Sequence, residues 1–313
     1  NRLGLTVARQ FNRRSEYDLH GPQATTKPAL LFRLTTFTGD LTFEHKPLAG
    51  KINGQIGLSG LYQYNFTDGR PLIPDFEQTN LGLFLIERLI HQKWEWEVGT
   101  RYDWRKLDVF RFIGTTLDPQ QHRFGSWSGT AGIVHNTKEW LSFRVNFGTA
   151  WRPPNPSELY SKGVHHGAAA YEEGNDQLKP EIAYNLVSSI DYNGKHFRAE
   201  LGAYYNSIRN FIYLKPQTEP ILTVRGAFPY FKYVQTQAYF TGIDLDTEWE
   251  IITKKLMHTQ KLAYLRAYDQ LENNYLVLIP ANRVENGLRW ELGRLFHQKN
   301  TYLSLNHLWV NKQ

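Results

Sequence analysis

The sequence contains no cysteine and no long apolar run. Without cysteine, the chain forms neither a disulfide framework nor a thiolate metal site, whatever compartment it occupies. The absence of any run of about 18 apolar residues excludes transmembrane helices. The sequence also lacks His-Glu-x-x-His, Gly-x-Ser-x-Gly and a phosphate-binding glycine loop, which are motifs of several enzyme classes. We therefore expect no enzymatic activity and no bound cofactor.

Charge of either sign is nowhere concentrated into a long block. The 36 basic and 30 acidic residues are interleaved, which leaves a net charge of +6. No basic stripe or known nucleic-acid motif is present, so we expect no nucleic-acid partner. A mildly basic protein would favour anionic small ligands drawn into a cavity.

Aromatic residues are abundant, at 14% of the chain, although the mean hydropathy is −0.51. The stretch KWEWEVGTRYDWRK, residues 93–106, shows how both can hold. Apolar side chains occupy alternate positions, and mostly charged ones lie between them: Trp94, Trp96, Val98, Tyr102 and Trp104 against Glu95, Glu97, Gly99, Arg101 and Asp103. A period of two predicts a strand with one apolar and one polar face. Residues 141–152, 197–206 and 243–251 repeat the pattern.

Short and long connections alternate between these segments. Short ones include HQK at 91–93, NTKE at 136–139 and NGK at 193–195, whereas long ones include residues 13–27, 67–79 and 152–179. Asn193-Gly194 predicts a two-residue hairpin turn with positive φ at both positions. This alternation, through about thirteen strands, is typical of outer-membrane barrels with short periplasmic turns and long extracellular loops. A soluble β-propeller or sandwich is the alternative.

A closed antiparallel barrel pairs every backbone group inside a membrane. In such a barrel the apolar face contacts lipid and the charged face lines a polar lumen. Tryptophans near strand ends would lie in the interfacial aromatic girdles, and they are Trp94, Trp104, Trp140 and Trp151.

The segment from Phe147 carries a series of motifs, FGTAWRPPNPSELYSKGVHHGAAAYEEGNDQLKPE. It resembles the TonB-dependent outer-membrane receptors, whose barrels carry Phe-Arg-x-Pro-Asn-x-x-Glu-Leu, Gly-x-His-x-Gly, Glu-x-Gly-Asn and Leu-x-Pro-Glu. The matching positions are Arg152, Pro154, Asn155, Glu158, Leu159, Gly163, His165, Gly167, Glu173, Gly174, Asn175, Leu178, Pro180 and Glu181. Trp151 replaces the usual Phe, and an extra proline shifts the spacing.

The resemblance implies an all-β fold, an antiparallel transmembrane β-barrel of the bacterial outer membrane. Barrels of this family have about 22 strands, so residues 1–313 would be a fragment with about thirteen of them. The plug domain, its TonB box and the final strands would be absent. Residues 152–179 would form a long extracellular loop.

The function implied by the resemblance is active import of a metal chelate, most often a ferric siderophore. The energy would come from the TonB–ExbB–ExbD complex through the plug. A haem or cobalamin receptor of the same family remains an alternative, as does a glycan importer acting with a surface lipoprotein. A passive porin or an adhesin is the alternative from another class.

Candidate ligand-binding residues are basic, aromatic or imidazole side chains of the loops: Arg152, Tyr160, His165, His166, Tyr171 and Arg225. Imidazole suits iron, copper and zinc, so His165 and His166 could ligate metal or haem, or could only order the loop. Four carboxylates at alternate positions could bind Ca²⁺ or pair with basic residues of neighbouring strands. These are Asp244, Asp246, Glu248 and Glu250.

Overall fold

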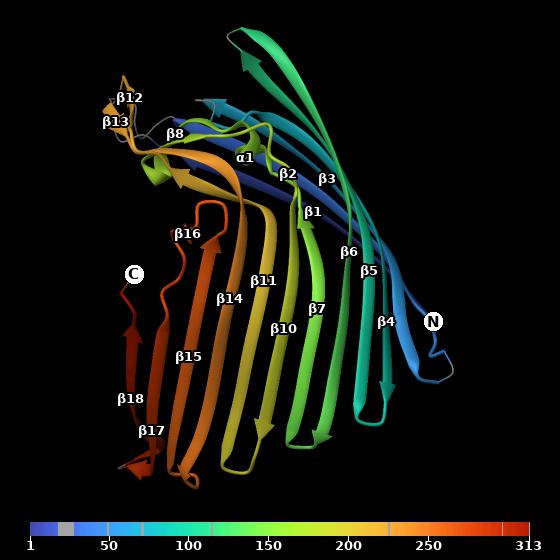
Figure 1. Cartoon of the computed structure of the whole chain (residues 1–313), viewed down its shortest axis with the longest axis vertical. Helices are drawn as coiled ribbons and strands as arrows, with labels where there is room; N and C mark the ends of the chain where they lie inside the picture. The colour runs from blue at the N-terminus through green and yellow to red at the C-terminus, as the bar shows by residue number, and fades with distance from the viewer. Residues whose placement is uncertain are drawn as a thin grey trace.

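A computed structural model describes residues 1–17, 28–48, 50–69, 72–113, 115–224, 226–295 and 297–312, without the side chain of His166. The fold is all-β, as predicted, and consists of one large curved sheet with a separate two-stranded sheet in a loop (Figure 1). Among the described residues, no helix is long and apolar enough to cross a membrane.

Thirteen strands follow one another in the sheet, and each is antiparallel to the next. They are β1 (Arg2–Glu16), β2 (Leu30–Glu44), β3 (Ile52–Gly69), β4 (Asp75–His91), β5 (Trp94–Ile113), β6 (Thr116–Lys138), β7 (Leu141–Arg152), β10 (Glu181–Asn193), β11 (Phe197–Pro216), β14 (Tyr230–Ile252), β15 (Leu256–Asp269), β17 (Arg283–Leu295) and β18 (Gln298–Val310). The predicted number of strands is confirmed. In the described residues β1 pairs with β2 alone and β18 with β17 alone, so the sheet does not close.

The smaller elements lie in the long connections: α1 (Pro156–Tyr160), β8 (Lys162–His165), η1 (His166–Ala168), β9 (Ala170–Glu173), β12 (Ile221–Thr223), β13 (Gly226–Phe228) and β16 (Asn274–Tyr275). Figure 1 shows these elements gathered at one end of the sheet, and the short turns at the other. The predicted short turns therefore lie at one end. The other end carries the long connections, except between β5 and β6, where Thr116 begins β6 only three positions after Ile113 ends β5.

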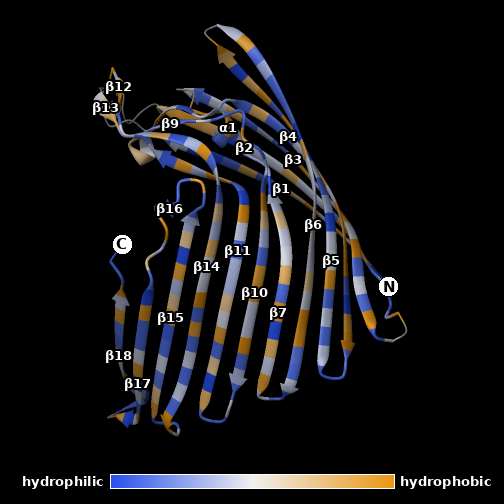
Figure 2. Cartoon of the chain, in the orientation of Figure 1, coloured by the Kyte–Doolittle hydropathy of each residue, from blue (hydrophilic) through white to orange (hydrophobic). Residues whose placement is uncertain are grey.

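Strand β5 has the two faces that its alternation predicts, and Figure 2 shows the same alternation along the other strands. On the outer face, Trp96 is 46% exposed and Val98 is 59% exposed. On the inner face, Arg101 Nη2 donates to Ser59 Oγ of β3 over 2.6 Å, and its Nε donates to Asp103. The charged group of Arg101 is therefore paired with residues on the concave face of the sheet.

Beyond Trp104 the polarity of the two faces is reversed, with apolar side chains on the inner face and charged ones on the outer face. Leu107 and Val109 are fully buried on the inner face, although Arg101 and Asp103 lie on the same face nearer the short turns. On the outer face Lys106 Nζ pairs with Asp108 at 2.7 Å. The apolar outer belt of β5 thus runs from position 94 to position 104, which matches the 9–11 residues that a tilted strand needs to cross a bilayer.

Candidate functional site

The segment between β7 and β10 folds back against the inner wall at the long-loop end. It contains α1, β8, η1 and β9, and β9 pairs in parallel with the start of β14, Tyr171 opposite Tyr230. This segment, residues 153–180, is called the mouth segment below. Figure 1 shows α1 and β8 at the upper end of the sheet.

Helix α1 starts where its sequence dictates. Asn155 is the N-cap: its side chain accepts from Glu158 N over 3.0 Å, and Glu158 Oε2 accepts from Asn155 N over 2.9 Å. This reciprocal capping box, together with Pro156 at the first helical position, fixes the start of a helix. The Pro-Asn-x-x-Glu-Leu motif is therefore a helix-start signal.

Arg152 fastens the mouth segment at both ends. Its Nη1 donates to both carboxylate oxygens of Glu158 over 2.8 Å, and its Nε donates to Glu181 Oε2 over 2.7 Å. Glu181 Oε1 accepts from Ile212 N on β11 over 2.6 Å. Both carboxylates are almost fully buried. The guanidinium thus joins the end of β7 to α1 and to the start of β10.

A small apolar core lies beneath α1. Leu159 and Tyr160 pack with inward side chains of the strand ends and with Leu178: the strand residues are Phe76, Leu107, Val109 and Ile212. Burial of such side chains contributes about 1.5–3 kcal/mol each. The inner wall is apolar at this height because the mouth segment covers it.

Gly174 lets the returning chain approach α1. A Cβ at this position would lie 2.6 Å from Leu159 C and Tyr160 N, closer than a side chain tolerates. The Gly174 N–H donates to Ser161 O over 2.6 Å, and Asn175 N donates to Glu158 O over 2.9 Å. The Glu-x-Gly-Asn motif therefore satisfies carbonyls at the end of the helix.

Tyr160 is buried, and its hydroxyl bonds to His122 Nε2 of β6. The Arg111 guanidinium lies 5.2 Å from the centre of the Tyr160 ring. Burial raises the pKa of Tyr160 to about 12, with a further contribution from Asp176. The hydroxyl therefore stays neutral at physiological pH and holds the helix against β6.

His165 lies between two carboxylates. Its Nδ1 is 2.8 Å from Glu172 Oε1, and its Nε2 is 3.7 Å from Glu16 Oε1 at the end of β1. Among the described side chains, no group of three histidine or acidic residues could hold a metal ion. The backbone of His166 begins η1, and its side chain lies outside the described part of the structure.

Tyr171 is half-buried on β9. Its ring contacts that of Tyr230 edge to face, with centres 5.8 Å apart, and burial together with Glu173 raises its pKa. Its N–H donates to Pro229 O over 2.8 Å. Arg225, the remaining candidate, lies outside the described residues.

The structure thus brings Arg152, Tyr160, His165 and Tyr171 to one end of the sheet. Sequence analysis missed the Tyr160 partners Arg111 and His122, which come from the β5–β6 hairpin far from the motif run. No local spacing marks either residue.

Three of the four carboxylates in the acidic row on β14 are paired across strands. Lys261 Nζ lies 3.2 Å from Asp246, Arg198 lies 4.0 Å from Glu248, and His196 Nδ1 lies 2.9 Å from Glu250. These contacts support the cross-strand alternative over a calcium site.

A sequence model of the family described as "TonB dependent receptor-like, beta-barrel" matches residues 2–312. No curated protein matches the chain by sequence. The solved structures that share its fold include the following three. The copper transporter OprC aligns with a TM-score of 0.74 at 15% identity, covering 98% of this chain and 53% of that one. The FrpB iron transporter from Neisseria meningitidis (F5-1 variant) aligns at 0.70 and 16%, covering 98% and 48%.

The third structure is the Serratia marcescens hemophore receptor HasR, in complex with its hemophore HasA and heme. It aligns at 0.63 and 16% identity, covering 84% of this chain and 50% of that one. The chain spans about half the length of these proteins.

Proposed function

The chain belongs to the TonB-dependent receptor-like β-barrel family, and from this premise we propose that it serves in active import of a metal chelate across the bacterial outer membrane. A ferric siderophore is the favoured cargo. TonB–ExbB–ExbD would supply the energy through a plug domain. The observation that carries the proposal is the mouth segment, which is fastened to the inner wall where the long loops meet.

We propose two roles for the six candidate residues. His165, His166, Tyr171 and Arg225 would contact the ligand, since anionic chelates are bound by cations and aromatic faces. Arg152 and Tyr160 would act indirectly, because their polar groups are engaged in fastening α1. Rigid support of a recognition loop is a common arrangement in binding proteins.

The histidine pair favours haem as the second candidate cargo. Imidazole is an axial ligand of haem iron, and the partly exposed His165 lies at the mouth beside His166. HasR, whose structure was solved with its hemophore and heme, shares the fold of this chain at 16% identity.

Uptake of ⁵⁵Fe as catecholate, hydroxamate and carboxylate chelates or as haem tests the proposal in iron-starved cells. Cells with the receptor and with TonB should accumulate at least one chelate, and deletion of either should abolish uptake. Uptake that persists without TonB would indicate a passive pore. Accumulation of haem alone would select the second candidate.

Two histidine variants separate recognition from folding. His165→Ala should weaken chelate binding, whereas His91→Ala, an exposed histidine at the opposite end, should leave it unchanged.

A tag inserted at the exposed Ala169 should be readable by antibody on intact cells. Equal loss of binding in both variants, or a silent tag on a folded receptor, would contradict the proposed mouth.

A further inference from the structure

Lysines are concentrated at the short-turn end. Segments 45–51, 92–93, 138–140, 194–196, 253–255 and 297–300, which form the six short turns, hold eight of the 16 lysines. They hold none of the 20 arginines and a single carboxylate, Glu139. We call the eight residues the lysine rim: Lys46, Lys51, Lys93, Lys138, Lys195, Lys254, Lys255 and Lys299. We propose that the lysine rim binds the headgroups of anionic phospholipids in the periplasmic leaflet.

Among the described residues, no rim ammonium group forms a close ion pair, although Glu250 is near enough to Lys254 to interact with it electrostatically. All eight side chains are exposed, and in the described part of the chain none is paired with a carboxylate. Three lysines of the strands, by contrast, pair with carboxylates: Lys106 with Asp108, Lys215 with Glu272 and Lys261 with Asp246. The charge of the short-turn end is thus left for a partner outside the chain.

The rim lies next to the apolar outer belt. Lys93 precedes Trp94, and Lys138 is two residues from Trp140, both tryptophans being exposed. Tryptophan marks the headgroup level of a bilayer, and lysine extends its apolar stem along such a surface while its ammonium reaches the polar layer. The rim ammonium groups therefore lie at the height of lipid phosphates.

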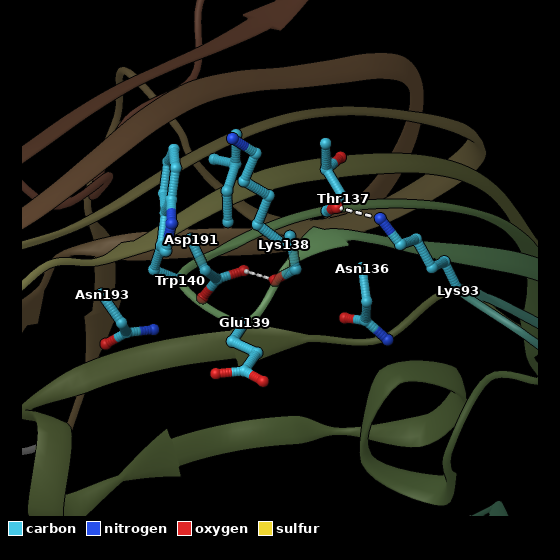
Figure 3. A pocket seen from close by; sticks show the side chains of 10 residues that line it. Lys93, Asn136, Thr137, Lys138, Glu139, Trp140, Asp191 and Asn193 are labelled. Carbon is cyan, nitrogen blue, oxygen red and sulfur yellow. Dashed lines mark hydrogen bonds between the residues drawn. The ribbon is translucent and has the colours of Figure 1, made fainter.

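Two of these lysines, Lys93 and Lys138, lie beside the turn between β6 and β7 (Figure 3). Lys93 Nζ donates to Thr137 O over 2.7 Å, and Lys138 Nζ lies 5.2 Å from the centre of the Trp140 ring. They border an open hollow of about 790 Å³, large enough for a phospholipid headgroup. Besides the two lysines, the lining holds two carboxylates: Asp191, which is paired with Arg144 at 2.9 Å, and the exposed Glu139.

The distribution of the lysines favours a bilayer over an acidic protein. Every short turn contributes at least one lysine, so the charge follows the plane in which the turns lie. An acidic protein would need one patch, whereas a leaflet contacts the whole rim. Each lysine near an anionic leaflet raises binding about fivefold.

Lipid competition in nanodiscs tests the proposal. The receptor, purified from outer membranes, is placed in mixed phosphatidylethanolamine and phosphatidylglycerol, and bound lipid is counted by native mass spectrometry. We expect preference for phosphatidylglycerol, weaker in 500 mM than in 50 mM salt because of screening. In K93Q/K138Q the preference should fall about fivefold for each lysine removed.

Two control variants make the test specific. K162Q/K179Q removes two exposed lysines of the mouth segment and should keep the wild-type preference. K93R/K138R retains charge and should keep it too. The proposal is overturned by equal affinity for both lipids, by an unchanged preference in K93Q/K138Q, or by its loss in K93R/K138R. Stronger rim-dependent binding of a soluble polyglutamate peptide than of phosphatidylglycerol would assign the surface to an acidic partner.

Discussion

Arg152 Nη1 lies 2.8 Å from both carboxylate oxygens of Glu158, a residue six positions later that the chain reaches only after the helix start. With Glu181 on the Nε side, the guanidinium stands between two nearly buried carboxylates. Arg152, a candidate ligand-binding residue by sequence, thus holds the mouth segment in place through these two carboxylates.

We predict that Arg152→Ala loosens the mouth segment. Both carboxylates would lose a charged hydrogen-bond donor, which costs about 2 kcal/mol and corresponds to about thirtyfold faster exchange of local amides. Hydrogen exchange of peptides from 153–180 measures it, with Lys162→Ala as the exposed control. Unchanged exchange combined with lost ligand binding would make Arg152 a direct ligand contact.

Gly174→Ala should loosen the same segment by a different route. Its methyl group would lie 2.6 Å from the α1 backbone, whereas Gly39 of β2 has no atom within 4 Å of the equivalent position. The backbone shift needed costs about 1–3 kcal/mol. Limited proteolysis should cut within 153–180 faster in Gly174→Ala than in Gly39→Ala. Equal cutting rates would show that the contact is easily relieved.

The Tyr160 hydroxyl should ionise at a higher pH than that of an ordinary tyrosine. Its ordinary pKa near 10 is raised to about 12 in the folded protein, so below pH 10 the hydroxyl is neutral in both folded and unfolded chains. Between about pH 10 and 12 only the unfolded chain releases the proton, and the stability of the mouth segment falls as pH rises. The tyrosinate absorbance of wild type minus Tyr160→Phe should therefore appear near pH 12. A difference that appears near pH 10 would contradict the buried position.

Val98→Arg should impair assembly, whereas Glu97→Val should be tolerated. Val98 lies midway along the apolar outer belt of β5, and Glu97 faces the interior. Arginine on the lipid face at mid-membrane costs about 2–4 kcal/mol. The heat-modifiable band of a folded barrel on gels measures assembly. The opposite pattern would mean that the faces of β5 are reversed.

The strands and their two ends could be predicted because alternation is a local property. Val98 and Arg101 differ in face by parity alone, whatever surrounds them. The inversion at Leu107 and Val109 could not be predicted in this way, since it depends on Leu159 and Tyr160, about fifty positions later. The same holds for the candidate site. Its residues could be chosen by type and by position in the loops, whereas their roles depend on partners far away in the sequence.

Two local predictions were wrong for physical reasons. Asn193-Gly194 does not form the centre of the turn: neither residue has positive φ, and the chain turns at Lys195 and His196 instead, between Gly194 N and the Phe197 carbonyl that accepts from it. Trp151 was assigned to a girdle, but its Nε1 donates to the inner carboxylate of Asp103 over 3.4 Å. Pairing of β6 with β7 stops at Thr130 and Gly148, which leaves space for this indole.

The 313-residue chain expressed alone should aggregate in detergent. Within the described residues, β1 has β2 as its sole partner and β18 has β17, so each outer edge presents unpaired backbone groups. Leu3 and Leu5 on β1 and Leu305 on β18 are at least 70% exposed. An unpaired edge in an apolar solvent costs several kcal/mol per group and pairs with another chain. Size-exclusion chromatography and gels of unboiled samples measure the outcome. A monomer with a heat-modifiable band would show that β1 and β18 meet and that these residues close a small barrel by themselves.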